Sequence, residues 1–186
     1  MKKSSLESIV PIGVIALLLG IVALGAWAFF GSSSPLSRVV GEKAPYVPNF
    51  PDPQTFEGQE GDKFVFQYPQ KFNVTTIPIE GGGKKILVES TQARKGFELT
   101  ILQFDEQERL TSERIRQDIP GIVIENEKST SVGVEKIPAL AFNSTDEYIG
   151  PTYEIWFVYQ GNLYEALTYP EFASEMEEIL KTWTFK

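Results

Sequence analysis

The longest uncharged stretch of the chain constrains its structure most. Residues 9–30 carry no charge and are almost entirely apolar. As an α-helix rising about 1.5 Å per residue, this stretch is about 33 Å long, which matches the hydrocarbon core of a bilayer. A cleaved signal peptide is the alternative, since Ala26, Trp27 and Ala28 resemble a cleavage site, but signal peptides usually have shorter apolar regions. The sequence predicts a short tail over residues 1–8 and a retained transmembrane helix after it.

The positive charges that flank this helix predict its orientation. Lys2, Lys3 and the terminal amine precede the helix, and Arg38 and Lys43 follow it. In most membrane proteins the flank with more positive charge stays in the cytoplasm. We therefore expect a single-pass protein of the cell membrane, with its N-terminus cytoplasmic and its C-terminal domain outside.

Small side chains recur along one side of the predicted helix. Gly13, Ala16, Gly20 and Ala23 follow one another at spacings of three and four residues, which places them on one stripe where a second helix can approach closely. Packing of two such helices into a homodimer is a hypothesis. Glycine and alanine are also frequent in membrane spans generally, so both alternatives stay open.

Residues 31–60 are rich in serine and proline and predict a tether. The prolines of this segment are Pro35, Pro45, Pro48, Pro51 and Pro53. Such a composition favours extended chain, which reaches about 90 Å at about 3.1 Å per residue. Tyr46, Phe50 and Phe56 interrupt the polar pattern, and we expect them to dock on the chain's own domain rather than on a partner. Residues 61–186 then form one domain.

Residue types that the chain lacks exclude several classes of function. The chain has no cysteine, which excludes disulfides, thiolate zinc sites and cysteine nucleophiles. It has no histidine, the commonest general base and transition-metal ligand, and no serine-nucleophile motif. Its net charge of −8 argues against nucleic acid and anionic lipid headgroups as partners. We expect no enzymatic activity and no cofactor.

Short apolar runs between turn residues predict extended strands in the domain. The runs cover residues 64–68, 72–77, 85–90, 97–104, 122–127 and 137–142. The first four are expected to follow one another as a meander. Gly81, Gly82 and Gly83 precede a strand and not a helix, so we expect a hairpin turn there rather than a phosphate-binding loop. Thr111 is expected to cap a short helix over residues 112–118.

The clearest local prediction is a hairpin of residues 153–160 and 163–169 around Gly161 and Asn162. We expect Gln160 to lie opposite Leu163. One face then carries Ile155, Phe157, Tyr159, Tyr164 and Ala166, and the other carries Trp156, Val158, Leu167 and Tyr169. Since both faces are apolar, the hairpin is expected in the middle of a sheet that is covered on both sides.

The last segment predicts an amphipathic helix that covers the sheet. Its apolar residues at helical spacing are Phe172, Met176, Ile179, Leu180 and Trp183. Glutamates crowd the start and the outer side of the same segment, where negative charge suits the helix dipole. We expect the apolar stripe to belong to the core and not to a cofactor site.

Two groups of carboxylates are the candidates for chemistry. Glu154 and Glu165 share one face of the hairpin, but the expected register separates them by roughly 13 Å at about 3.3 Å per residue, too far for either glycosidase geometry. Asp105, Glu106 and Glu108 form, with Glu113, an acidic patch whose oxygens suit calcium. The patch lacks the alternating ligands and the glycine of a calcium loop, so a solvated surface is the alternative.

Both ends of the domain resemble PsbP-like domains. The run from Phe64 to Pro69 with Phe72 is similar to their first strands, and the run from Ile179 to Phe185 is similar to their closing helix and tail. The resemblance implies an α+β fold, an antiparallel sheet with helices on both faces, and a non-catalytic role in supporting or assembling a membrane complex from outside. Photosynthetic members help to retain manganese, calcium and chloride. We transfer none of these ions, because this chain has no histidine and has a membrane helix that those members lack.

These observations favour a membrane-tethered, extracytoplasmic, non-enzymatic binding or assembly module with a protein partner. The first alternative is an envelope hydrolase that uses carboxylates alone. The second alternative is a carrier of a small ligand or ion, which needs a concave pocket.

Overall fold

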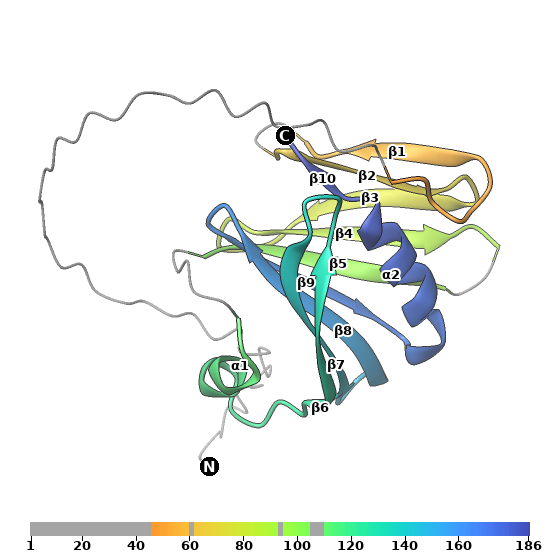
Figure 1. Ribbon diagram of the computed structural model, residues 1–186. Coiled ribbons are helices and arrows are strands. Elements are labelled where there is room, and N and C mark those ends of the chain that lie inside the picture. Colours follow the sequence, from red (N-terminus) through yellow and green to blue (C-terminus); the bar gives the residue numbers. More distant parts are fainter. Residues whose placement is uncertain (1–45, 60–61, 93–94, 105–109) are drawn as a thin grey trace, which may run out of the picture. The chain divides into compact units, whose positions relative to one another are not determined.

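The computed structural model describes residues 46–59, 62–92, 95–104 and 110–186 (Figure 1). The predicted transmembrane helix, with its stripe of Gly13, Ala16, Gly20 and Ala23, lies outside these residues. No helix in the described part of the chain has the length and apolar character needed to cross a bilayer.

The largest element of the fold is an antiparallel seven-stranded sheet in the order β3-β4-β5-β9-β8-β7-β6 (Figure 1). Its strands are β3 (Phe72–Pro78), β4 (Lys84–Ser90), β5 (Gly96–Gln103), β6 (Glu125–Val132), β7 (Ile137–Asp146), β8 (Gly150–Tyr159) and β9 (Asn162–Thr168). The predicted hairpin supplies β8 and β9, which lie near the middle of the sheet as expected. Gly81 and Gly82 have φ of 90° and 88° in the turn between β3 and β4, so the glycine run is a hairpin turn.

A second sheet has three strands in the order β1-β2-β10. They are β1 (Pro53–Glu57), β2 (Phe64–Pro69) and β10 (Thr184–Phe185). Two predictions need correction here. The strand at residue 64 pairs with β1 and β10 instead of opening a four-strand meander, and residues 53–57 belong to the domain although the sequence placed them in the tether.

Two short α-helices complete the fold: α1 (Ser112–Asp118) and α2 (Ala173–Lys181), the latter preceded by the 3-10 turn η1 (Pro170–Phe172). The expected cap of α1 is present, since the backbone N–H of Arg114 donates to Thr111 Oγ1 at 3.2 Å.

On α2, Glu177 accepts a hydrogen bond from the hydroxyl of Tyr153 and pairs with Lys128 at 3.0 Å. These contacts fasten α2 to the large sheet.

The main core lies between the large sheet, the small sheet and α2. We call the side of the large sheet that faces this core the inner face. Trp183 is fully buried there, with ring centroids 4.5 Å from Phe64 and 5.0 Å from Phe66. The predicted stripe of the last segment is confirmed as core, because each of its members is buried: Phe172, Met176, Ile179, Leu180 and Trp183.

A smaller apolar cluster lies on the opposite side of the large sheet, which we call the outer face. Ile115 of α1 packs there with Leu140, Phe142 and Trp156. Ile122 and Ile124 pack on this cluster. They precede β6, which begins at Glu125, so the strand predicted over residues 122–127 begins and ends later than expected. Helices thus contact both faces, but only two are present in the described residues, and the small sheet covers much of the inner face.

The β8–β9 hairpin has the predicted faces but not the predicted register. Tyr159 lies opposite Asn162 and Val158 opposite Leu163, so each residue of β9 is displaced by two positions from its expected partner. Gln160 and Gly161 have φ of 48° and 75°, which makes them the two central residues of the turn. A slip of two residues keeps every side chain on its face, which is why the face assignment holds.

Candidate functional site

On the outer face, four neighbouring strands each contribute one side chain to a row that crosses the sheet. Cross-strand pairing places Lys85 of β4 opposite Thr100 of β5, Thr100 opposite Glu165 of β9, and Glu165 opposite Trp156 of β8. Side chains of directly paired residues have Cβ atoms about 4.5–5.5 Å apart, so this row places them in contact. The row lies beside the cluster under α1.

Lys85 neutralises one carboxylate of this face. Its Nζ lies 2.5 Å from Oε1 of Glu98, and the hydroxyl of Thr100 donates to the same oxygen at 3.3 Å. Both charged side chains are about one third exposed, so the pair is partly screened by solvent. The ion pair holds Glu98 at the middle of the face.

Glu154 is the most deeply buried carboxylate of the outer face, with 6% of its surface exposed. The hydroxyl of Thr152 donates to Oε1 and the indole N–H of Trp156 donates to Oε2, each at 2.9 Å. Burial raises the pKa of Glu154, and hydrogen bonds from Thr152, Trp156 and Ser144 oppose this rise. Since both oxygens are occupied, the group is held by the fold.

Glu165 lies closer to Glu154 than the sequence predicts. It pairs with Trp156 and not with Val158, which makes it a diagonal neighbour of Glu154 on the next strand, at a Cα separation of about 7–8 Å. The pKa of Glu165 is raised to about 7: burial raises it most, the charge of Glu154 also raises it, and the charge of Lys85 opposes the rise. The charge of Glu154 therefore affects the pKa of Glu165. The predicted separation of 13 Å is wrong because the turn of the hairpin lies at other residues than the sequence indicated.

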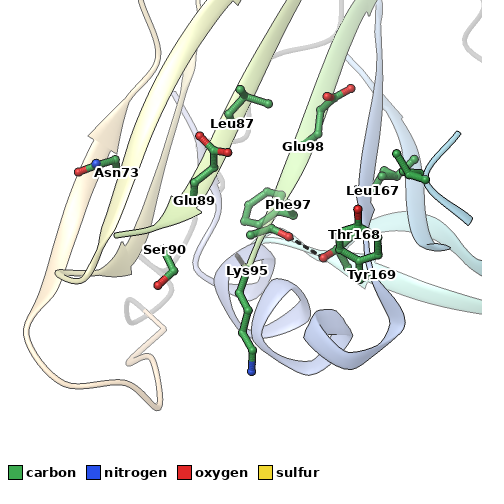
Figure 2. Close-up of a pocket in the computed structure, with 12 residues that line it drawn as sticks. Asn73, Leu87, Glu89, Ser90, Lys95, Phe97, Glu98, Leu167, Thr168 and Tyr169 are labelled. Carbon is green, nitrogen blue, oxygen red and sulfur yellow. Dashed lines mark hydrogen bonds between the residues drawn. The ribbon is translucent and has the colours of Figure 1, made fainter. Parts of the chain in front are cut away.

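A pocket of about 470 Å³ adjoins these carboxylates at one end of the sheet (Figure 2). We call it the sheet-end pocket. It is lined by residues of β3, β4, β5 and β9, by the turns at their ends and by Ile149. Leu87 and Leu167 supply apolar walls, and Glu89, Glu98 and Lys95 supply the charges (Figure 2).

Exposed apolar side chains gather at the rim of the sheet-end pocket. Ile149 and Tyr169 line it and are 42% and 43% exposed, and Tyr148, next to Ile149, is 84% exposed. The loop that carries Tyr148 and Ile149 is fixed by Asp146, whose Oδ1 accepts from the backbone N–H groups of both residues at 2.7 and 3.0 Å. The loop therefore presents these two side chains to solvent in a defined geometry.

Metal binding has no support among the residues that the structure describes, where no cluster of three or more acidic residues is arranged to hold an ion. The predicted calcium candidates Asp105, Glu106 and Glu108 lie outside those residues.

The sequence identified the two carboxylates of the β8–β9 hairpin as candidates but did not predict the sheet-end pocket. The missed signal was the apolar pair Tyr148 and Ile149 in a loop, next to acidic residues.

The described part of the chain is thus an antiparallel α+β domain with one sheet face partly open. No protein-family model and no curated protein sequence matches the chain. Among solved structures, it is similar to the solution structure of cyanobacterial PsbP (CyanoP) from Synechocystis sp. PCC 6803, with a TM-score of 0.47 and 11% sequence identity over 84% of this chain and 98% of that chain. At this identity the function has to be argued from the residues of this chain.

Proposed function

We propose that this chain is a membrane-anchored, non-enzymatic, PsbP-like module that binds or helps to assemble a membrane or envelope protein complex outside the cytoplasm. The observation that supports this proposal best is the exposed apolar rim of the sheet-end pocket. Single exposed apolar residues are common, but Ile149 and Tyr169 both line this concave site, and the exposed Tyr148 is next to Ile149 in the chain. Aromatic and aliphatic side chains in such a setting are typical of protein interfaces.

The way in which the tether joins the domain agrees with this role. The hydroxyl of Tyr46 donates to Glu178 of α2, the backbone N–H of Asn49 donates to the same carboxylate at 3.0 Å, and Phe50 packs on the core. The chain thus enters the domain at α2, on the inner side of the large sheet. These described contacts of residues 46–50 involve none of the residues that line the sheet-end pocket.

The anchor itself is tested by extraction and proteolysis. Full-length protein is expected to stay with membranes after an alkaline carbonate wash, with residues 1–30 present in its intact mass. Protease added to intact cells is expected to digest the C-terminal domain. A soluble product that begins near Phe29 would contradict anchoring, and survival of the domain in intact cells would contradict the orientation.

Partner binding is tested by chemical crosslinking in native membranes and affinity capture. The wild-type chain is expected to capture a specific membrane or envelope protein, and the double variant Tyr148→Ser with Ile149→Ser is expected to lose it. Val47→Ser is the matched control, since Val47 is 82% exposed and lies next to the tether contact. Equal capture by the wild type and the double variant would remove the pocket from the proposal, and capture of nothing above background would contradict the binding function.

A carboxylate-dependent hydrolase is the second candidate, because the observed register brings Glu154 and Glu165 together and the pKa of Glu165 is about 7. Against it, both oxygens of Glu154 already accept hydrogen bonds from the fold. Turnover of a glycoside or ester substrate that disappears in Glu165→Gln would favour this candidate over the binding module.

A further inference from the structure

We infer that the sheet-end pocket receives an extended, cationic segment of a partner protein that places an apolar side chain between its walls. This inference rests on the proposed function and adds the chemistry of the partner. It follows from three properties of the same surface: its length, its charge and its apolar rim.

The length of the pocket suits a short extended segment. Its lining begins on β3 at Asn73, crosses β4 and β5, and reaches β9 at Leu167. Neighbouring strands are about 4.8 Å apart, so this path covers about 14 Å, or about four residues of extended chain. Leu87 and Leu167 lie on either side of Glu98 on the outer face, since each is paired with it across the sheet. An apolar side chain that enters between them contacts both leucines.

The charge of the surface is negative where a partner would approach. The side chain of Glu89 is exposed, and among the described residues it has no hydrogen-bond or ion-pair partner. Glu98 already has Lys85 as its partner, and Lys95 is the one cation among the described residues that line the pocket. The loop at the rim adds Asp146 and Glu147.

Behind the pocket, Glu154 lies opposite Leu167 across β8 and β9, and Glu165 is close by. Among the described residues on and around the pocket, the acidic side chains therefore outnumber the lysines, which are Lys71, Lys85 and Lys95. A lysine or arginine side chain of the partner can pair with the exposed carboxylate of Glu89, whereas an anionic segment or an anionic lipid headgroup would be repelled.

The apolar rim distinguishes a protein segment from a small cation. Ile149 and Tyr169 line the pocket, Tyr148 precedes Ile149 in the same loop, and all three are exposed. A free metal ion or polyamine would leave these side chains in water. A peptide with alternating cationic and apolar residues covers them and contacts the carboxylates at the same time.

The direct test measures peptide binding by fluorescence anisotropy. The full chain is reconstituted in nanodiscs of phosphatidylcholine, which has no net charge and does not attract a cationic probe. The probe is a labelled peptide of about six residues in which lysine and arginine alternate with leucine and tyrosine. Its comparison peptide has glutamate in place of each lysine and arginine. We expect the cationic peptide to bind at least about tenfold more tightly than the acidic one.

Two pairs of variants locate the binding. Glu89→Lys and Ile149→Ser are each expected to weaken binding of the cationic peptide by about tenfold. Their matched controls are Glu125→Lys, an exposed glutamate of the distant edge strand β6, and Val47→Ser, and both are expected to bind like the wild type. Near-ultraviolet circular dichroism of each variant checks that its fold is intact.

Three outcomes overturn the inference: no binding of the cationic peptide, equal binding of the acidic peptide, or equal weakening by Glu89→Lys and Glu125→Lys. The last outcome would indicate attraction to the net negative charge of the whole domain. These failures are distinct from failure of the proposed function. If capture in native membranes still depends on Tyr148 and Ile149 while the cationic peptide does not bind, the module binds a partner of different chemistry.

Discussion

Glu165 shows how strongly one residue of this domain depends on its neighbours across the sheet. Its partner residues are Thr100 on β5 and Trp156 on β8, with Glu154 diagonal to it and Lys85 one strand further away. The sequence identified Glu154 and Glu165 as residues of one face, because alternation along a strand fixes the face. It did not show that they interact, because strand register depends on the turn and on contacts distant in the chain.

The raised pKa of Glu165 predicts a pH-dependent stability. Its pKa rises from the ordinary value of 4.5 to about 7 in the folded state, so the folded state binds the proton more tightly than the unfolded state. The free energy of unfolding therefore decreases as pH rises through this window. We expect Glu165→Gln to gain about 3 kcal/mol over the wild type between pH 4.5 and pH 8.

Urea unfolding at the two pH values measures this gain. Glu125→Gln serves as the control, since Glu125 is exposed and is expected to change stability by less than about 0.5 kcal/mol at either pH. A Glu165→Gln variant that is less stable than the wild type at pH 8 would show that the ionised carboxylate contributes favourable contacts instead of a cost.

The indole of Trp156 is predicted to stabilise the fold through its N–H group as well as its packing. Trp156→Phe keeps a ring in the cluster with Phe142, at a centroid distance of 5.6 Å in the wild type, but removes the donor to Oε2 of Glu154. An unpaired buried polar oxygen costs about 1–3 kcal/mol. We expect a loss of that size in urea unfolding at neutral pH, and Tyr148→Phe, at an exposed position, should change stability little. Equal effects of the two substitutions would contradict this role.

At the scale of the elements, the positions of most strands and of α1 and α2 were predictable from the sequence. Which strands pair with one another was harder to predict. The runs that became β3, β4, β5 and β7 and the capped helix α1 follow local patterns of alternation and capping. The partner of β2 could not be predicted in the same way. The ring centroids of Phe56 of β1 and Phe66 of β2 are 5.0 Å apart. Phe56 belongs to a stretch whose prolines indicated a tether, so this contact was not expected to define a strand pair.

The turn of the β8–β9 hairpin gives a prediction about backbone conformation. Gln160 occupies a left-handed conformation, with φ of 48°, at the first central position of the turn, where asparagine is favoured. Gln160→Asn is expected to stabilise the domain by about 0.5 kcal/mol or more, because asparagine adopts this conformation more readily. Gly161→Ala is expected to destabilise it by about 1 kcal/mol or more, since Gly161 has φ of 75°. Thermal unfolding measures both, and a destabilising Gln160→Asn would contradict the assigned turn.

At the scale of the whole molecule, the junction between the predicted tether and the domain is a defined contact. Tyr46, Phe50 and Phe56 interrupt a polar segment, which led to the expectation that they dock on the domain. Tyr46 does so through Glu178, and Phe50 and Phe56 pack against the core. The sequence did not show where the domain begins, because prolines occur both in tethers and in edge strands such as β1.

Removal of the Glu178 carboxylate is predicted to release this junction without unfolding the domain. The hydrogen bond from Tyr46 lowers the pKa of Glu178, so the contact is present at neutral pH and is lost as pH falls through that lowered value. In Glu178→Ala, we expect faster hydrogen exchange at residues 46–50 and unchanged exchange in β8 and β9. Glu171→Ala, at an exposed glutamate of η1, is the control. Unchanged exchange at Asn49 would contradict the assigned contact.

Site-specific photocrosslinking tests the central claim most directly. A photoreactive residue replaces Tyr148 in the loop next to the sheet-end pocket in the full chain, and in a second protein it replaces Glu125, an exposed residue of the edge strand β6 that does not line the pocket. Illumination of native membranes is expected to give one discrete adduct with a membrane or envelope protein from position 148 and none from position 125. Absence of an adduct from position 148, or the same adducts from both positions, would contradict binding through this face.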